Sequence, residues 1–262
     1  MKSFNCQLFN ARSSNNKLHE LHHVLVTESL DILCITETLL KPSTLDSLLI
    51  SGISSYSVFR KDRADSQGGG VCLITNCVTV KAIRLEIDVK YMDLDLLCID
   101  ILNTRLPVRV IVGYRPPPNP SSDTASDAIQ STNHFIEYLQ SLCNVDASIV
   151  FVGDFNFPNI DWSNLQFAVD NDRCSTFFTM FAKQYCFDQL VSEQTRLQPS
   201  GNDSLLDMVL CNDPFIVCDV AVCDPFSVSD HCSIKFKVIT PVQSASQPAH
   251  EFRILITQTG IV

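Results

Sequence analysis

The sequence has no apolar run long enough to cross a membrane and no cysteine motif typical of a zinc or redox site. A membrane span takes roughly 18 or more apolar residues, and no stretch of the chain approaches that length. The first six residues, Met1 to Cys6, contain no apolar signal stretch. The 12 cysteines include no CxxC pair, and most lie within apolar runs, as Cys34 and Cys98 do. We therefore expect reduced, buried thiols in a protein of the nucleus or cytoplasm that has no membrane partner.

Glycine motifs for nucleotide binding are also missing. The chain has neither a GxGxxG nor a Walker sequence, so no nucleotide cofactor is indicated. Its one glycine run, Gly68-Gly69-Gly70, leads into a β-rich stretch. That position favours a turn with unusual φ angles over a phosphate cradle.

Positive charge is scarce, and its scarcity is local. The chain has 19 Lys and Arg against 29 Asp and Glu, a net charge of −10. Residues 145–231 include 13 acidic and three basic residues, so the whole excess lies in one third of the chain. This balance argues against a strongly basic coat for nucleic acid. We expect most of these acids on a solvated surface and some of them around a cation.

Apolar periodicity predicts more strands than helices. Helices are predicted over 15–30, with Asn15 or Asn16 as the cap, and over 125–142 and 173–187. The predicted strands span 30–36, 71–85, 95–102, 108–114, 148–152, 204–211, 215–222 and 231–239. Several neighbouring strands are joined too closely for a helical crossover, which favours antiparallel pairing in mixed sheets with helices outside. The composition shifts to Pro, Gln, Ser and Ala after Thr240, so one domain over 1–240 and an irregular C-terminal tail over 241–262 are expected.

Polar residues recur where the apolar strands end. Singly, each of them is best explained as a strand-end cap or a turn former. Together, six such positions favour a functional site at one rim of a sheet. The residues at these positions are Asn10, Glu37, Tyr114, Arg115, Asp154, Asn156, Asp207, Asp230 and His231.

The motifs at these positions resemble those of the endonuclease/exonuclease/phosphatase family, and most closely the apurinic-like endonuclease domain of non-LTR (LINE-type) retrotransposons. They appear in the family's order across residues 5–240 as Asn10-Ala11-Arg12-Ser13, Ile35-Thr36-Glu37-Thr38, Gly68-Gly69-Gly70-Val71, Tyr114-Arg115-Pro116-Pro117, Gly153-Asp154-Phe155-Asn156, Leu206-Asp207-Met208-Val209 and Ser229-Asp230-His231. The resemblance implies an α/β fold of four layers. Two mixed, largely antiparallel sheets pack face to face with helices outside, as in DNase I.

The resemblance also implies hydrolysis of a phosphodiester with the help of Mg²⁺, or of Mn²⁺. A hard cation prefers oxygen ligands and offsets the charge on the phosphate and the leaving oxygen. By this analogy Glu37 is the main metal ligand, Asn10 lies in the same shell, and Asp230 supports the metal or the nearby histidine.

The remaining catalytic roles follow from the same resemblance. Asp154 orients or deprotonates the attacking water, and Asn156 helps to hold the water and the phosphate. His231 donates a hydrogen bond to the phosphoryl oxygen as charge develops there. Asp207 orients His231 and favours its cationic form, while the Tyr114 hydroxyl contacts the phosphate.

DNA is the expected substrate, nicked on one strand to leave a 3′-hydroxyl, and a reverse transcriptase domain or chain is the expected partner. Thr195 is expected to line the cleft. The basic residues expected to contact the phosphate backbone are Arg12, Arg60, Lys61, Arg63 and Arg115. Two alternatives stay open: a phosphatase or phosphodiesterase acting on a small or lipid phosphate, because the fold does not decide the substrate, and an inactive remnant of a retroelement.

Overall fold

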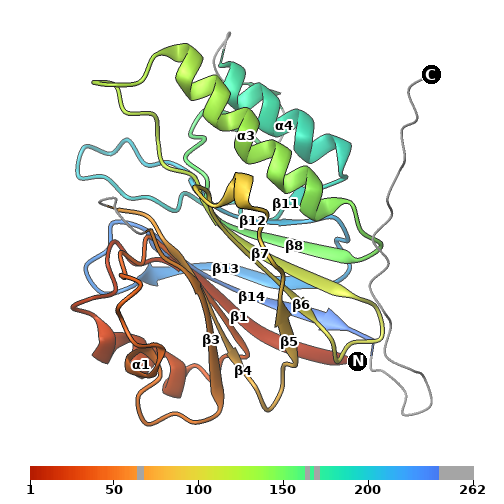
Figure 1. The fold of residues 1–262 in the computed structure, drawn as a ribbon. Helices are drawn as coiled ribbons and strands as arrows, with labels where there is room; N and C mark the ends of the chain where they lie inside the picture. Colours follow the sequence, from red (N-terminus) through yellow and green to blue (C-terminus); the bar gives the residue numbers. More distant parts are fainter. Residues whose placement is uncertain (64–67, 163–165, 168–171, 242–262) are drawn as a thin grey trace.

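The computed structural model describes residues 1–63, 68–162, 166–167 and 172–241 and contains two six-stranded sheets (Figure 1). The first sheet has the order β13 (Val217–Pro225), β14 (Cys232–Thr240), β1 (Lys2–Asn10), β2 (Ile32–Thr36), β4 (Val71–Asn76) and β3 (Tyr56–Lys61). The second has the order β11 (Asp188–Gln189), β12 (Asp207–Cys211), β8 (Ser148–Asp154), β7 (Val108–Tyr114), β6 (Asp95–Ile101) and β5 (Ala82–Arg84).

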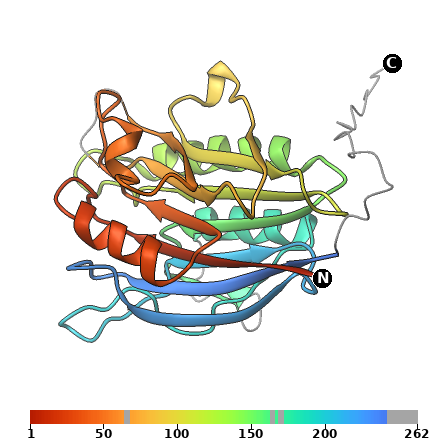
Figure 2. The same cartoon turned by 90° about the horizontal axis from the view of Figure 1, so that it is seen from below.

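Helices cover the outer face of each sheet, which gives four layers (Figures 1 and 2). The first sheet is covered by α1 (Leu18–Thr27) and α2 (Asp46–Leu49), and the second by α3 (Ala125–Cys143) and α4 (Arg173–Gln184). The pairs β1–β2 and β7–β8 run parallel, whereas the other paired strands of the two sheets run antiparallel. The predicted sandwich of mixed sheets with outer helices is therefore confirmed.

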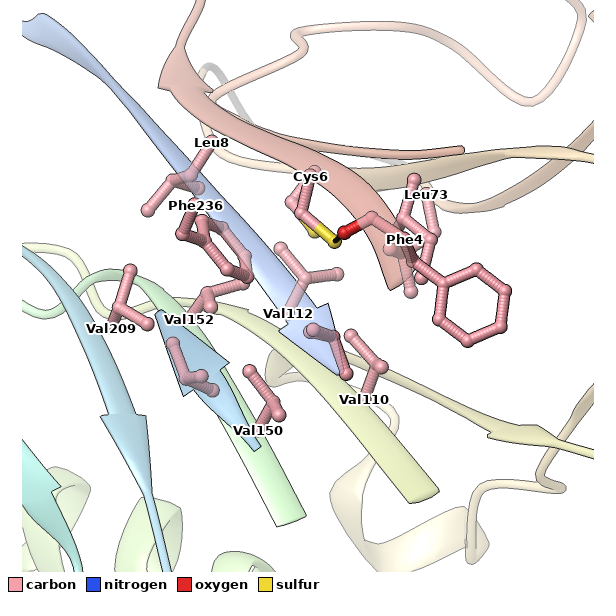
Figure 3. Packing of buried hydrophobic residues seen from close by; sticks show 14 of the residues in the cluster. Phe4, Cys6, Leu8, Leu73, Val110, Val112, Val150, Val152, Val209 and Phe236 are labelled. Carbon is pink, nitrogen blue, oxygen red and sulfur yellow. Dashed lines mark hydrogen bonds between the residues drawn. The ribbon is translucent and has the colours of Figure 1, made fainter. Parts of the chain in front are cut away.

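Strands buried on both faces explain the continuous apolar runs in the sequence. Along β8, Val150 and Val152 pack into the core between the sheets, whereas Ile149 and Phe151 pack against the helices α3 and α4. Side chains of a strand alternate between its two faces, so each face must be apolar when both are buried. Figure 3 shows the inter-sheet core, where strands of the two sheets face each other.

This alternation also sets the position of a polar row at one end of the second sheet. The register pairs Asp207 with Asp154, Asp154 with Tyr114, and Tyr114 with Asp95, so four strands contribute one residue each. Each of the four lies two residues from a residue of the inter-sheet core, such as Val152 for Asp154. The four side chains therefore leave the sheet on the face turned toward the first sheet, where the apolar core ends.

One local prediction was wrong, and one strand was not predicted. Helix α1 begins at Leu18 and has no side-chain cap, because the Asn15 amide instead donates to the carbonyl oxygen of Leu39 at 2.9 Å. The polar stretch 56–65 includes the strand β3, whose Lys61 is buried and donates through Nζ to the carbonyl oxygens of Tyr91 and Leu94. A buried lysine that donates to carbonyl oxygens can thus lie in a strand that periodicity alone does not indicate.

The cysteines, the search for membrane-spanning helices and the C-terminal tail can each be compared with the expectations from the sequence. None of the 12 cysteines forms a disulfide, and seven are buried. No helix among the described residues is long and apolar enough to cross a membrane. The strand β14 ends at Thr240, and the predicted tail lies outside the described residues from position 242 onward.

Candidate functional site

The site begins where the parallel strands β1 and β2 end side by side. Beyond the strands, the Ser13 amide donates to the Glu37 carbonyl oxygen at 2.9 Å, so the two loops stay paired. Arg12, Ser13 and Glu37 have φ angles of 42°, 88° and 49°, and Asn156 in the facing loop has 51°. Side chains other than glycine rarely adopt this left-handed conformation, and it occurs preferentially at functional sites. Four such residues meet at this rim.

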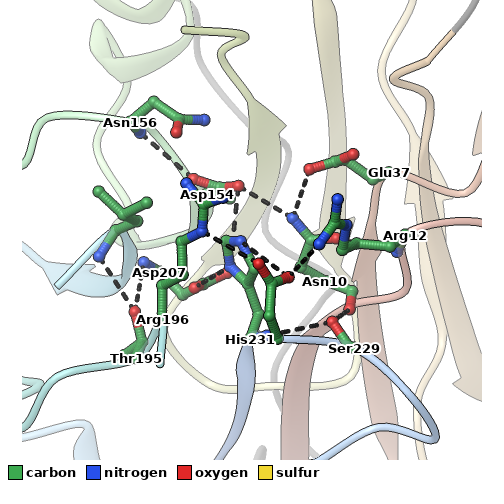
Figure 4. Close-up of polar contacts among 12 residues, drawn as sticks. Asn10, Arg12, Glu37, Asp154, Asn156, Thr195, Arg196, Asp207, Ser229 and His231 are labelled. Carbon is green, nitrogen blue, oxygen red and sulfur yellow. Dashed lines mark hydrogen bonds and ion pairs between the residues drawn. The ribbon is translucent and has the colours of Figure 1, made fainter. Parts of the chain in front are cut away.

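Asn10 joins acids that come from the two different sheets. Its Nδ2 donates to Glu37 Oε1 at 2.7 Å and to Asp154 Oδ2 at 2.9 Å (Figure 4). Asn10 ends β1 in the first sheet, and Asp154 ends β8 in the second. The buried Asn10 amide thus binds one carboxylate on each side and links the two sheets of the sandwich.

His231 and Asp207 form a buried ion pair next to the hydrogen-bonded series Glu37–Asn10–Asp154. His231 Nδ1 lies 2.7 Å from Asp207 Oδ2 and 3.9 Å from Asp154 Oδ2, and both ring and carboxylates are almost fully buried. Burial lowers the pKa of His231, but the charge of Asp207 and its hydrogen bond outweigh it and raise the pKa to about 9. The imidazole is therefore cationic at neutral pH, with Nδ1 facing Asp207.

The pKa of Asp154 is also raised, which for a carboxyl group favours the neutral form. Burial raises its pKa, the charges of Asp207 and Glu37 raise it further, and the opposing effects of His231 and the Asn10 amide leave it at about 8. Burial disfavours the carboxylate by removing it from water, and the two neighbouring acids disfavour it by like-charge repulsion. The site thus lacks positive charge at the centre of its acids.

A divalent cation fits this deficit. Glu37 and Asp154 offer carboxylate oxygens, the ligands that a hard cation prefers, and the Asn10 amide that faces them donates to both. The buried Oδ1 of Asp207 has no hydrogen-bond partner among the described residues. Asp154, Asp207 and His231 also bring ligand atoms within 4.8 Å of one another.

Both carboxylate oxygens of Asp230 lie within ion-pair distance of an arginine. Its Oδ1 is 2.7 Å from Arg12 Nη1, and its Oδ2 is 3.2 Å from Arg196 Nε. Burial raises its pKa, but these two arginines and His231 lower it below the usual value. The structure therefore places Asp230 in an ion-pair group beside His231, at Nε2, rather than on Glu37. Sequence reasoning did not select Arg196, because its partner is 34 residues away.

Tyr114 lies beside the ion pair of Arg63 and Asp95, which also explains why position 69 is a glycine. Burial raises the pKa of its hydroxyl, and Glu37 adds to this, so the hydroxyl remains a hydrogen-bond donor. The Arg63 guanidinium lies 5.9 Å from the Tyr114 ring centre and forms an ion pair with Asp95. Gly69 has φ +77°, and a Cβ there would lie 2.4 Å from Arg63 Nε. The predicted glycine turn is confirmed, and it makes room for this ion pair.

Two residues expected to contact substrate, Thr195 and Arg115, make structural hydrogen bonds inside the protein. Thr195 is fully buried, and its hydroxyl accepts hydrogen bonds from the backbone amides of Leu206 and Asp207, so it positions the latter. Arg115 is also buried and donates to the carbonyl oxygens of Phe155 and Asn156. It therefore braces the loop that carries Asn156.

Arg60 does not join the site. Its guanidinium is paired with Asp46 and Asp62 and donates to the carbonyl oxygen of Thr44.

Asn156 lies at the rim, where its Nδ2 donates to the Arg115 carbonyl oxygen at 2.9 Å. It lines an open groove of about 710 Å³ together with Arg196.

Known proteins share both the sequence pattern and the fold. Residues 108–235 match a family model described as endonuclease-reverse transcriptase. The resemblance to the endonuclease/exonuclease/phosphatase family is confirmed. The family segment contains Tyr114, Asp154, Asn156, Asp207 and His231, whereas Asn10 and Glu37 precede it. No curated protein matches the chain.

Solved structures extend the family fold to nearly the whole chain. The AP endonuclease LMAP from Leishmania major is 14% identical with a TM-score of 0.72, covering 92% of this chain and 89% of that one. The endonuclease domain of TRAS1, a telomere-specific non-LTR retrotransposon, is 13% identical with a TM-score of 0.65, covering 92% and 100%. An AP endonuclease from Archaeoglobus fulgidus is 19% identical with a TM-score of 0.67, covering 91% and 100%. At these identities the likeness establishes the DNase I-like fold.

Proposed function

We propose that this protein is a divalent-metal-dependent DNA endonuclease that hydrolyses one strand and leaves a 3′-hydroxyl. The observation that carries the proposal is the buried pair of His231 and Asp207 beside the Glu37–Asn10–Asp154 chain. It combines a cationic hydrogen-bond donor with carboxylates that lack compensating charge, which suits an anionic phosphodiester and a cation together.

His231 is the donor to the phosphate. Its Nδ1 is bound to Asp207, so Nε2 is the nitrogen left to donate to a non-bridging phosphoryl oxygen. Asp207 keeps the ring charged and fixes its orientation, while Thr195 fixes the backbone of Asp207. Charge that develops on the phosphoryl group thus meets a donor that is already oriented.

Asp154 and its neighbours act on the attacking water. Asp154 can accept a proton only as the carboxylate, and because its pKa is raised to about 8, a nearby positive charge would favour that form at neutral pH. Glu37, with Asn10 beside it, would hold a divalent cation, which would supply that charge and offset the charge of the phosphate and leaving oxygen. Asn156 holds the water and the phosphate at the groove, and the Tyr114 hydroxyl donates to the phosphate.

A plasmid assay tests the proposal. Supercoiled DNA should relax in Mg²⁺ and not in EDTA, and a DNA polymerase should extend the nicks. Glu37→Gln should abolish nicking, and His231→Gln should lower kcat roughly 100- to 1,000-fold, the usual effect of losing one donor to a developing charge. Glu28→Gln is the matched control, because it removes one carboxylate from a surface ion pair with Lys235. Glu28→Gln should nick as the wild type does.

A second candidate is a phosphatase. A 3′ phosphatase, NExo from Neisseria, has the same fold at 14% identity with a TM-score of 0.68. Release of phosphate from 3′-phosphorylated DNA or from inositol phosphates, without nicking, would favour this candidate. Neither activity from folded protein in Mg²⁺ would refute both and favour an inactive retroelement remnant. A reverse transcriptase domain or chain as partner remains part of the proposal and would show as co-purification.

A further inference from the structure

Asp230 connects two arginines that come from distant parts of the chain. Arg12 belongs to the loop after β1, and Arg196 lies in a backbone bridge next to His231. The two guanidinium groups reach the same carboxylate at 2.7 and 3.2 Å (Figure 4). The arginine side chains are 52% and 35% exposed, so both remain accessible to a ligand. Two positive charges against one negative charge leave the group cationic.

The backbone fixes this group relative to the catalytic residues. The Arg12 amide donates to Asn10 Oδ1 at 3.0 Å, and the Leu197 amide donates to the Asp230 carbonyl oxygen at 2.9 Å. Asp230 Oδ1, which binds Arg12, also lies 3.9 Å from His231 Nε2. The arginines therefore stand beside the ring nitrogen that faces away from Asp207. A ligand on that nitrogen and a ligand on the arginines would be neighbours.

The acidic character of the chain makes this position informative. Residues 145–231 carry three basic residues, and Arg196 is the one whose guanidinium contacts the site, whereas Arg173 lies over the Phe177 ring. A polyanion approaching a protein of charge −10 needs a local cationic group to offset the repulsion. An arginine pair suits phosphate, because guanidinium groups donate several hydrogen bonds in a fixed plane.

We propose that Arg12 and Arg196, held in place by Asp230, bind the backbone phosphate next to the scissile phosphate. This inference rests on the proposed endonuclease function and adds to it a second phosphate site. Asp230 is then a positioning residue, and each arginine binds substrate. A small phosphodiester without a neighbouring phosphate makes no use of the group.

Kinetics on two substrates test the inference. Arg12→Gln and Arg196→Gln should each raise KM for duplex DNA roughly 5- to 30-fold and lower the salt dependence of binding by about one phosphate contact. The KM for bis(p-nitrophenyl) phosphate should change by less than about twofold. Lys237→Gln is the matched control, since it breaks an ion pair with Asp219 and lies six residues along β14 from His231, about 20 Å away. Equal losses on both substrates would overturn the inference.

Binding without metal separates this inference from the proposed function. Anisotropy of a labelled duplex in EDTA should show weaker binding by Arg12→Gln and Arg196→Gln than by Lys237→Gln, by at least fivefold. Arg196→Lys should keep part of the affinity. If the wild type does not nick DNA but this ranking holds, the endonuclease proposal fails and the phosphate site stands. If all the variants, each with wild-type circular dichroism, bind equally, the phosphate site is refuted whether or not the protein nicks DNA.

Discussion

Replacing Asp207 with asparagine removes a charge from the site and leaves the shape of the side chain unchanged. Asp207 is the main reason that the pKa of buried His231 stands at about 9 rather than near 6.5. With asparagine, burial of the ring is opposed only by the smaller effects of Asp154 and Asp230, so the pKa should fall toward 6.5. At pH 7.5 the imidazolium fraction should drop from about 97% toward about 10%.

The pH dependence of stability follows from the same pair. The difference between 6.5 and about 9 corresponds to about 3 kcal/mol of unfolding free energy, because one pKa unit is about 1.4 kcal/mol. The folded-state pKa is raised, so this stabilisation is fully present below pH 6.5 and is lost as the pH rises through 9. At pH 7.5 about 2 kcal/mol should remain. Asp207→Asn should therefore be most destabilising in mild acid and close to neutral above pH 9.

Two measurements check this reasoning. An NMR pH titration of the histidine ring signals in EDTA gives the pKa of His231 in the wild type and in Asp207→Asn. Urea unfolding of both proteins at pH 6, 7.5 and 9 gives their free energies of unfolding. The nicking rate of Asp207→Asn should fall at least tenfold at pH 7.5 and recover in part near pH 6. Asp203→Asn, a change of the same kind at an exposed loop acid, should leave the pKa of His231 unchanged.

Specific results would refute the argument. If His231 still titrates near 9 in Asp207→Asn, Asp207 is not the source of the shift. If the nicking defect is equally large at pH 6 and pH 7.5, Asp207 orients the ring and does not set its charge. A stability difference that does not change between pH 6 and pH 9 would contradict the linkage itself.

Two further predictions concern stability. Arg109 forms a buried bidentate ion pair with Asp100 at 2.7 and 2.8 Å, so Arg109→Met should cost about 3–5 kcal/mol in urea unfolding, whereas the double variant with Asp100→Leu should recover most of it; equal losses in both would contradict this. Gly69→Ala should cost more than Gly201→Ala in the same assay, because both have positive φ but only the first meets the Arg63 guanidinium, and equal costs would mean that the collision is relieved.

Most of the fold follows from the sequence because its strands are apolar on both faces. The run Ile149 to Val152 predicts a buried strand, and its end at Asp154 predicts a polar rim. The stretch 56–65 could not be predicted as a strand, because Lys61 is buried only by virtue of carbonyl oxygens that are 30 and 33 residues away. Periodicity reports the burial of apolar side chains, and it carries no information on buried polar groups that have distant partners.

The site residues could be predicted from the sequence, whereas their hydrogen-bond and ion-pair partners could not. Strand ends and the family resemblance select Asn10, Glu37, Asp154, Asp207 and His231, which the structure brings together in one network. The two sheets meet at one rim, and the inter-sheet face of each strand decides which side chains point into it. Which residues serve as partners does not follow from the motifs. Nothing local to the Ser-Asp-His motif indicates that its aspartate would be paired on both oxygens.

The distribution of charge along the chain therefore differs from its distribution in space. The acidic third supplies Asp154, Asp207 and Asp230, but the neutral remainder supplies Glu37 and one of the cations that balance the group, Arg12. The centre of the site stays short of positive charge while its rim has a surplus of one. A phosphate and a divalent cation arriving together would correct both imbalances, the cation at the buried acids and the phosphate at the arginines and His231. If the proposed function holds, this acidic protein should bind DNA weakly in EDTA and much more tightly when the cation is present, because each ligand relieves a charge that the other site leaves uncompensated.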